Sequence, residues 1–433
     1  MSDRTILVWF RNDLRVHDNE ILLEATRKAD KVLPVYCFDP FYFKNKECGG
    51  LKTGNFRARF LLEAVADLRN NLRALGGELI IRIGDPAEII PQLATQYQVN
   101  EVYHHREVAF EETAKSEEVE AALWKNRLNL KHFIGHTLYH KEDLPFPIKD
   151  IPDSFAVFKK KIERDSNVRP AIAGPEQIII PEITDAGEMP TLTELGLAEP
   201  IDDARATLQF TGGETAGLLA LEKFFTNTAT LTGKAQRNPQ VQAENSSKLS
   251  PWLALGCLSL RRMYWEAIKH GHSNNSPVVT ELLWRDYFRF MFKKHGHKFF
   301  KPEGFKNEAP ETAANQDELF ELWKQGNTGV PFVDAAMHQL NATGYIDNYS
   351  RQIVAGYMVR ELKVDWTRGA GYFEEKLIDY SPASTWGNWA FVAGVGNDPR
   401  DNRNFINKPS AELESKSPFI DTWLTAGETT LSS

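Results

Sequence analysis

The chain has 433 residues, of which 42% are hydrophobic and 25% charged, and its net charge at pH 7 is −8. This length is enough for two domains with a core each, and the composition excludes a disordered chain. The net negative charge argues against a uniformly basic surface that would bind DNA without sequence preference. A local basic face within Phe292–Lys298 or Arg400–Arg403 is compatible with it, and an ordinary solvated helix face is the alternative for each run.

Export and membrane insertion find no support in the sequence. It has no run of about 18 apolar residues, and the apolar run Thr5–Phe10 near the start is only one strand long. Cys37, Cys48 and Cys257 are too few and too scattered for a disulfide framework or a CxxC metal site. We therefore expect a cytoplasmic monomer that makes no membrane contact.

Short β-branched or aromatic runs alternate with segments of helical spacing up to residue 140. They predict strands at Thr5–Phe10, Lys31–Phe38, Glu78–Ile83, Glu101–His104 and Asn129–Phe133, with helices such as Asn55–Leu75 and Glu111–Asn126 between them. This alternation predicts a doubly wound parallel sheet in an α/β domain of residues 1–140. Ligands of such sheets lie beyond the carboxyl ends of the strands, which places Phe10–Asp13 and Arg106–Glu107 near a bound molecule.

A proline-rich stretch from 141 to 210 reads as a connector with one short helix, Phe155–Arg164. Residues 211–433 are predicted to form an all-α domain. Its helices are expected at Glu214–Phe225, Pro251–His270, Thr280–Lys294, Asp317–Gln325, Val333–Asn341, Ser350–Leu362 and Gly371–Ile378.

Two motifs in the second half suit an anionic or planar ligand. Asn245–Trp252 places hydroxyls and a proline at a helix start, which favours a phosphate, although ordinary serine capping explains the same residues. Glu281 and Trp284 share one helix face and offer an acceptor and a stacking platform to a base; a core tryptophan beside a surface glutamate is the alternative.

Arg351 and Asp379 could clamp a planar cofactor, and a structural salt bridge is the competing interpretation. Trp366, Trp386 and Trp389 could carry electrons from the surface to a cofactor, or could simply be core residues.

Three histidines, His132, His136 and His140, are four residues apart, as metal ligands on a helix would be. Gly135 and the alternation of the segment favour a strand or loop there, so we predict no metal site.

Long motifs across the chain resemble those of the photolyase/cryptochrome family and, within it, the cryptochrome DASH branch. The resemblance rests on TILVWFRNDLRVHDNEIL, LPFPIKDIPDSFAVFKKKIE, GGETAGLLALEKFF, NSSKLSPWLALGCLS, ELLWRDYFRF, GNTGVPFVDAAMHQLNATGYIDN and TWGNW followed by GVGNDPRDNRNF. It implies an antenna domain, which in many members holds methenyltetrahydrofolate, and a helical domain that holds FAD.

The resemblance also implies roles for individual residues. FAD contacts fall on Ser246, Ser247, Lys248, Leu249, Ser250, Arg285, Asn348, Arg351, Asp379, Ser381 and Thr385. DNA or lesion contacts fall on Glu281, Trp284, Tyr349, Gln352 and Arg403, and electron transfer on Trp389 and Trp366, with Trp386 or Trp323 replacing a missing outer tryptophan. Glu107 is the implied antenna contact.

The implied reaction is blue-light-driven repair of cyclobutane pyrimidine dimers by reduced FAD. Single-stranded DNA is the preferred partner, because flipping a dimer out of a duplex costs a few kcal/mol. Thr385 and Ser381 depart from the family's usual asparagine and aspartate beside the flavin. These departures leave a photoreceptor that signals through a partner as an alternative, and a flavin-poor nucleic-acid-binding protein as a third.

Overall fold

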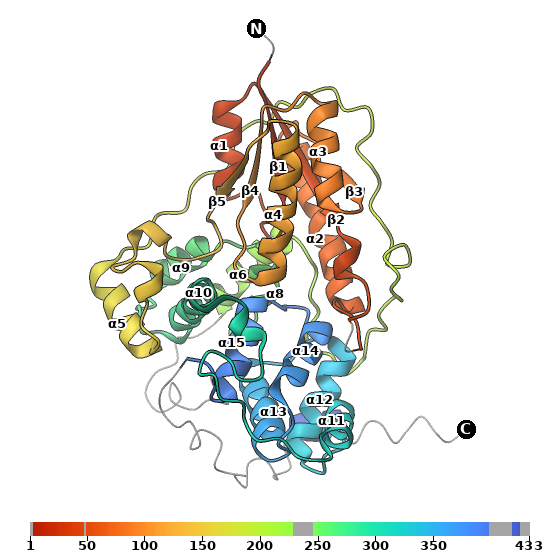
Figure 1. Ribbon diagram of the computed structural model, residues 1–433, viewed down its shortest axis with the longest axis vertical. Coiled ribbons are helices and arrows are strands. Elements are labelled where there is room, and N and C mark those ends of the chain that lie inside the picture. Colours follow the sequence, from red (N-terminus) through yellow and green to blue (C-terminus); the bar gives the residue numbers. More distant parts are fainter. Residues whose placement is uncertain (1–2, 47–48, 228–245, 398–417, 425–433) are drawn as a thin grey trace.

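The computed structural model describes residues 3–46, 49–227, 246–397 and 418–424. A parallel sheet with its helices occupies residues 5–133, here called the sheet region, and helices from residue 214 onward form the helical region (Figure 1). The strands begin at the end of the molecule where the N-terminus lies, and their carboxyl ends point toward the helical region (Figure 1). Any site at the carboxyl edge of the sheet therefore lies between the two regions.

The sheet has five parallel strands in the order β3-β2-β1-β4-β5. They are β1 (Thr5–Phe10), β2 (Lys31–Phe38), β3 (Ile80–Ile83), β4 (Glu101–His105) and β5 (Leu130–Phe133). The chain runs outward from β1 through β2 to β3 and then returns to add β4 and β5 on the other side. This order confirms the doubly wound α/β fold, and it makes the end of β1 the point where the strand order reverses.

Alternate residues of β1 face opposite helix layers, as a strand buried on both sides requires. Ile6 and Val8 pack with residues of α1 (Glu20–Lys28) and α2 (Asn55–Ala74). Leu7 and Trp9 pack with residues of α3 (Pro86–Gln96) and α4 (Phe110–Lys125). The near-continuous apolar sequence of the strand follows from this double coverage.

The connector between the two regions is anchored along much of its length. It contains α5 (Phe155–Asp165) and the short turns η2 (Lys141–Asp143) and η3 (Ile148–Asp150). Backbone hydrogen bonds of 2.8 Å join Ile178 N to Leu75 O and Val32 N to Ile179 O. The connector is therefore fastened to the sheet region, and α5 packs against the helical region.

The helical region is built around α10 (Pro277–His295), most of whose side chains are buried. Around it lie α6 (Glu214–Asn227), α8 (Ser250–Ala254), α9 (Leu260–Lys269), η5 (Gly296–Phe300), α11 (Gln316–Gln325), α12 (Pro331–Thr343), α13 (Asn348–Arg360), α14 (Trp366–Lys376), α15 (Pro382–Val392) and α17 (Pro418–Leu424). An added Cβ at Gly387 of α15 would lie 2.4 Å from Phe288 of α10, so a glycine is needed for this crossing.

The single helix predicted at Pro251–His270 is wrong. The chain forms α8, turns, and starts again at α9, where the Ser259 side chain caps the new helix by accepting from Arg262 N. The turn contains Gly256 at φ +65°, and an added Cβ there would lie 1.9 Å from Asn12 O. The helix breaks because this backbone must approach the sheet region closely.

Candidate functional site

Most of the predicted site residues line one cavity of about 690 Å³ in the helical region. A volume of this size is within the range of ordinary ligand pockets. We call it the helical cavity. It brings together Ser246, Ser247, Lys248, Leu249, Ser250, Glu281, Trp284, Arg285, Asn348, Arg351, Gln352, Asp379, Ser381, Thr385 and Trp389. Residues more than 140 positions apart in the sequence thus meet around a single space.

Arg351 and Asp379 form an ion pair on the wall of this cavity. The Arg351 Nη2 atom lies 2.8 and 3.0 Å from the two Asp379 carboxylate oxygens, and Arg351 Nε donates to Ile346 O at 2.8 Å. Burial opposes the charged guanidinium, but the neighbouring Asp379 carboxylate raises the pKa of Arg351 above its ordinary value. The salt-bridge interpretation is confirmed, with Asp379 buried and Arg351 partly exposed on the cavity wall, and the role of the pair as a clamp for a cofactor stays a prediction.

The serine-rich segment meets the cavity at the start of α8. Pro251 lies at the first helical turn, and the N-cap residue is Leu249, which makes no side-chain capping bond. None of Ser246, Ser247 and Ser250 is therefore the N-cap of α8, although the Ser247 hydroxyl accepts from Leu249 N at 3.4 Å just before the helix. Their hydroxyl groups, together with Lys248, form a donor-rich end of the cavity that suits phosphate oxygens.

Glu281 and Trp284 of α10 form another wall. Solvent reaches Glu281 through the open cavity, but the surrounding protein displaces bulk water and raises the pKa of this carboxyl to about 7. Trp284 is only half-buried, so it is not a simple core residue. One of its faces stacks on Phe155 of the connector helix, with ring centroids 3.6 Å apart.

Phe155 itself lines the cavity, although sequence reasoning assigned no contact to it. The proline-rich pattern around it predicts a connector helix and indicates nothing about a site. An aromatic residue at the first position of an isolated amphipathic helix was the available signal, because such a helix must pack its apolar face against something.

The predicted electron-transfer tryptophans form two close pairs. Trp389 lines the helical cavity, and its ring centroid lies 6.1 Å from that of Trp323. The Trp366 and Trp386 centroids lie 5.8 Å apart. Trp366, Trp386 and Trp323 do not line the helical cavity.

Two other predicted residues lie elsewhere. Tyr349 packs against Phe332 with centroids 5.9 Å apart and is not among the residues that line the cavity. Glu107 is buried at the boundary of the two regions, where its carboxylate lies 2.8 Å from Arg289 Nη2 and 3.3 Å from His136 Nε2. Arg403 falls outside the described residues.

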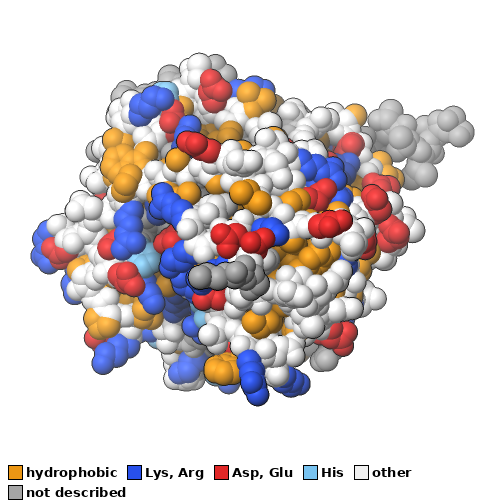
Figure 2. Space-filling view, turned by 90° about the horizontal axis from the view of Figure 1, so that it is seen from above, with side chains coloured by type: hydrophobic (Ala, Val, Ile, Leu, Met, Phe, Trp, Pro, Cys, Tyr) orange, Lys and Arg blue, Asp and Glu red, His pale blue; other side chains and the backbone are white. Residues whose placement is uncertain are grey.

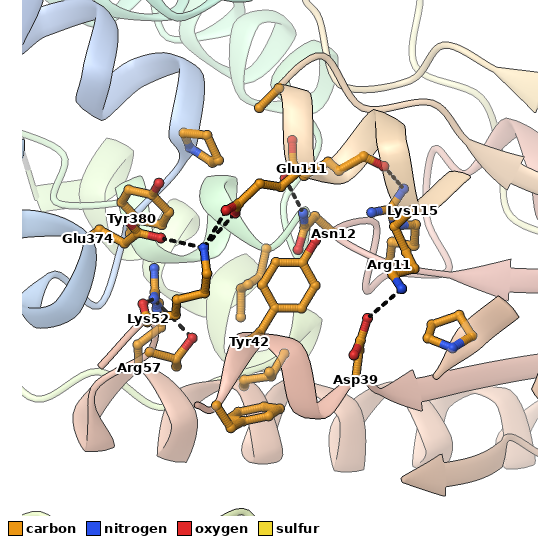
Figure 3. A pocket seen from close by; sticks show the side chains of 18 of the residues that line it. Arg11, Asn12, Asp39, Tyr42, Lys52, Arg57, Glu111, Lys115, Glu374 and Tyr380 are labelled. Atoms are coloured by element: carbon orange, nitrogen blue, oxygen red, sulfur yellow. Dashed lines mark hydrogen bonds and ion pairs between the residues drawn. The ribbon is translucent and has the colours of Figure 1, made fainter. Parts of the chain in front are cut away.

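A second cavity, of about 370 Å³, lies between the sheet region and the helical region; we call it the interdomain cavity (Figure 3). Phe10, Arg11 and Asn12 line it, as predicted from the end of β1, whereas Asp13, Arg106 and Glu107 are not among its lining residues. Figure 3 shows Lys52 directed between Glu111 of α4 and Glu374 of α14. Both regions therefore supply its walls.

One carboxyl group of the interdomain cavity is buried beside another. Burial, with a further contribution from Glu107, raises the pKa of Glu112 above its ordinary value. Lys52 is engaged by Glu111, with its Nζ 2.7 Å from Oε2, and Lys115 lies 3.1 Å from Asp85. The cavity thus presents paired charges beside a buried carboxyl group.

Comparison with known proteins identifies the family of this chain. Residues 6–176 match the DNA photolyase family and residues 278–430 match the FAD binding domain of DNA photolyase. A cryptochrome DASH from Gloeobacter violaceus is 44% identical over 98% of this chain and 86% of its own length. One from Danio rerio is 40% identical over 98% of this chain and 83% of its own length. The chain belongs to the photolyase/cryptochrome family, in its cryptochrome DASH branch.

Two solved structures share the fold. A cryptochrome of Synechocystis sp. PCC6803 superposes with a TM-score of 0.89 at 40% identity, over 98% of this chain and 89% of that one. An archaeal photolyase from Sulfolobus tokodaii, solved with two FAD molecules, gives 0.79 at 25% identity, over 97% and 90% of the two chains. FAD is therefore the cofactor of this protein, and the ion pair, the serine hydroxyls and the size of the helical cavity fit it.

Proposed function

We propose that this protein repairs cyclobutane pyrimidine dimers in DNA under blue light, with a preference for single strands. The observation that carries the proposal is the convergence of Glu281, Trp284 and Gln352 with the Arg351–Asp379 pair on one cavity. When bound and reduced, FAD supplies an electron to the dimer on absorbing blue light and takes it back after the ring has opened.

The residues of the chain do the binding and orienting. Arg351 and Asp379 hold the ring system of the cofactor, and the serine-rich start of α8 and Lys248 hold its phosphates. Trp284, backed by Phe155, offers a flat apolar surface on which an unstacked base can lie. Glu281, neutral below pH 7, can donate a hydrogen bond to a base carbonyl.

The preference for single strands follows from the cost of base flipping. A dimer in a duplex has to be unstacked before it enters a cavity, which costs a few kcal/mol. The face of the molecule in Figure 2 intersperses Lys and Arg with Asp and Glu. That face, seen from above at the sheet end of the molecule, therefore offers no continuous positive surface of the kind on which duplex binding depends. We propose that DNA contacts centre on the helical cavity, which Glu281, Trp284 and Gln352 line.

The experiment compares a dimer-containing oligo(dT) as a single strand and annealed to its complement. Reduced protein is illuminated without oxygen, and the loss of dimers is followed by chromatography. We expect faster loss from the single strand. Equal rates would contradict the strand preference, and no loss from either substrate would contradict repair.

A blue-light photoreceptor is the second candidate function. Thr385 and Ser381 favour it, because both line the cavity where a hydroxyl stands in place of the family's usual amide or carboxylate. A hydroxyl cannot offer the paired donor and acceptor of an amide, so the redox behaviour of the cofactor differs. Light-dependent binding of a partner protein without dimer loss would support this second function.

A methenyltetrahydrofolate antenna stays part of the proposal. Its predicted contact, Glu107, lies at the boundary of the two regions and is already engaged by Arg289. Absorption of the freshly purified protein tests this, because a bound folate adds a band at shorter wavelength than the flavin bands. The same spectrum tests the flavin-poor alternative.

Among the described residues, no helix has the length and apolar character that spanning a membrane requires.

A further inference from the structure

Helix α5 of the connector lies beside α10 and is fastened to it on both sides of Phe155 (Figure 1). Asp153, just before the helix, lies 2.8 Å from Lys294 Nζ. Phe158, one turn into the helix, is 0% exposed, and its ring centroid lies 5.0 Å from that of Tyr287. These contacts hold Phe155 in place, although it is the first residue of the helix.

Aromatic rings lie around Trp284. Phe155 covers one of its faces, with ring planes 11° apart and centroids separated by 3.6 Å. The centroids of Tyr287 and Phe288 lie 5.7 and 5.5 Å away, and that of Phe391 lies 5.8 Å away. Because the stacked rings are in van der Waals contact, the Trp284 ring can turn out of its plane only if Phe155 moves.

Phe155 extends the apolar face of α5 past the part that anchors the helix. Phe158 and Ile162 lie further along the same face, and both are fully buried. Phe155 is only partly buried, and both it and the exposed Ala156 line the helical cavity. The ring of Phe155 is therefore part of the cavity wall as well as part of the packing between α5 and α10.

We propose that Phe155 is a positioning residue, which fixes the ring plane of Trp284 and thereby makes the helical cavity selective for a pyrimidine dimer over undamaged bases. The inference rests on the proposed function. The two pyrimidines of a dimer are joined covalently into a rigid ligand, whereas separate bases can reorient. A rigid wall favours a rigid ligand, because neither partner then loses much conformational freedom on binding.

The first test measures selectivity in the dark. Full-length, FAD-loaded protein is titrated with oligo(dT) that carries a dimer and with undamaged oligo(dT). Phe155→Leu retains an apolar side chain but removes the flat ring. We expect this variant to bind the dimer about 3- to 10-fold more weakly, because one more side chain has to be ordered on binding. Its affinity for undamaged oligo(dT) should stay close to that of the wild type.

The conservative variant and the kinetics separate positioning from a loss of structure. Phe155→Tyr should restore the preference for the dimer, because tyrosine supplies a ring of the same shape. An equal loss of affinity for both oligonucleotides in Phe155→Leu, or no loss for either, would overturn the proposal. In illuminated, reduced protein, Phe155→Leu should raise the half-saturating dimer concentration more than it lowers the maximal rate. A lower maximal rate alone would also count against the proposal.

A double-mutant cycle tests whether Phe155 acts through Trp284. Trp284→Leu removes the ring that Phe155 is proposed to fix. Adding Phe155→Leu to that variant should therefore change the affinity for the dimer little. If the two changes instead weaken binding independently, so that their effects add, Phe155 does not act through Trp284 and the proposal is wrong.

Phe146→Leu is the matched control. Phe146 is also a partly buried aromatic residue of the connector, and its ring centroid lies 5.9 Å from that of Phe158. It is not among the residues that line the helical cavity. We expect Phe146→Leu to keep the selectivity of the wild type. A loss as large as that in Phe155→Leu would overturn the proposal, because loosening the connector elsewhere would then have the same effect.

The wild-type protein separates this inference from the proposed function. A preference for the dimer in the dark without loss of dimers in the light would count against repair. The positioning role would still stand if Phe155→Leu lowered that preference. No preference for the dimer in the wild type would overturn both the positioning role and the proposed function.

Discussion

Glu281 gives the site a pH dependence of its own. Its pKa of about 7 lies above the ordinary value of 4.5, so the carboxyl is neutral below pH 7 and ionised above it. The neutral form donates a hydrogen bond and carries no charge to repel phosphates. We expect affinity for a dimer-containing oligonucleotide to fall as pH rises through 7, as measured by titration at pH values on either side. Glu281→Gln should remove this step; a step of the same size in the variant would contradict the assignment.

Asp379 holds the Arg351 guanidinium on the cavity wall. Asp379→Ala leaves that cation without its partner in a largely buried position, and we expect it to lower the free energy of unfolding by about 3 kcal/mol. Asp317→Ala is the control, because the Asp317–Arg368 pair is exposed and should cost less than about 1 kcal/mol. Denaturant titration measures both. Equal losses of unfolding free energy in the two variants would show that the Arg351–Asp379 pair stabilises the protein no more than an exposed pair does.

At the scale of single residues, the sequence could predict which side chains line the helical cavity. It was a poorer guide to the contacts that those side chains make. Motif resemblance identified the serine segment and the Arg351–Asp379 pair, and these residues meet around one space. It could not predict that Phe155 stacks on Trp284, because that contact joins a connector helix to α10 across more than a hundred residues. Contacts between distant segments leave no local pattern.

Among elements, the crossing of α14 and α15 depends on Gly369. An added Cβ there would lie 2.3 Å from Trp389 Cη2 and 2.7 Å from Met358 Cε. Because of these clashes, the two helices could not pack as closely as they do. Gly369→Ala should lower the free energy of unfolding by about 1–3 kcal/mol through overpacking. It should also perturb the Trp389 fluorescence, because the ring has to move.

Gly371 supplies the matched control on the same helix. Its nearest neighbour to an added Cβ is the flexible end of Lys46, 3.9 Å away, so there is room for a methyl group. Gly371→Ala should be neutral or stabilise the protein by up to about 1 kcal/mol, since alanine favours a helix over glycine. Thermal unfolding compares the two variants. A larger loss of stability in Gly371→Ala than in Gly369→Ala would refute the packing argument.

The strands β1 and β2 could be predicted closely because each is a nearly continuous apolar run between turn residues. The bounds of β1 and β2 agree with the expected Thr5–Phe10 and Lys31–Phe38. The break between α8 and α9 could not be predicted from helical spacing alone. It arises where Gly256 meets the backbone of Asn12, a contact with a region far away in the sequence.

In the molecule as a whole, the buried Glu107–Arg289 pair joins the sheet region to α10. Glu107→Gln should cost about 3 kcal/mol of unfolding free energy, because it leaves the Arg289 cation buried without a countercharge. The double variant Glu107→Leu/Arg289→Met should recover much of that loss. Denaturant unfolding measures the free energy of unfolding of each variant. A double variant that is less stable than either single variant would contradict this account.

The arrangement of two cavities about α15 could not be predicted, although the sequence indicated a site at the end of β1. That cavity forms only when the carboxyl edge of the sheet meets α14 and α15. Its walls come from segments that are neighbours in space but more than 300 residues apart in the chain. The family resemblance predicted the cofactor. Which residues line which cavity depends instead on how the two regions pack together.

The most direct test of the central claim is a count of products from a dimer-containing oligo(dT) under anaerobic blue light. Protein with chemically reduced FAD, protein with oxidised FAD and a dark sample are compared. The account predicts that thymine bases reappear as dimers are lost, in the illuminated reduced sample alone. Dimers that stay intact in that sample, with FAD bound and reduced, would contradict it.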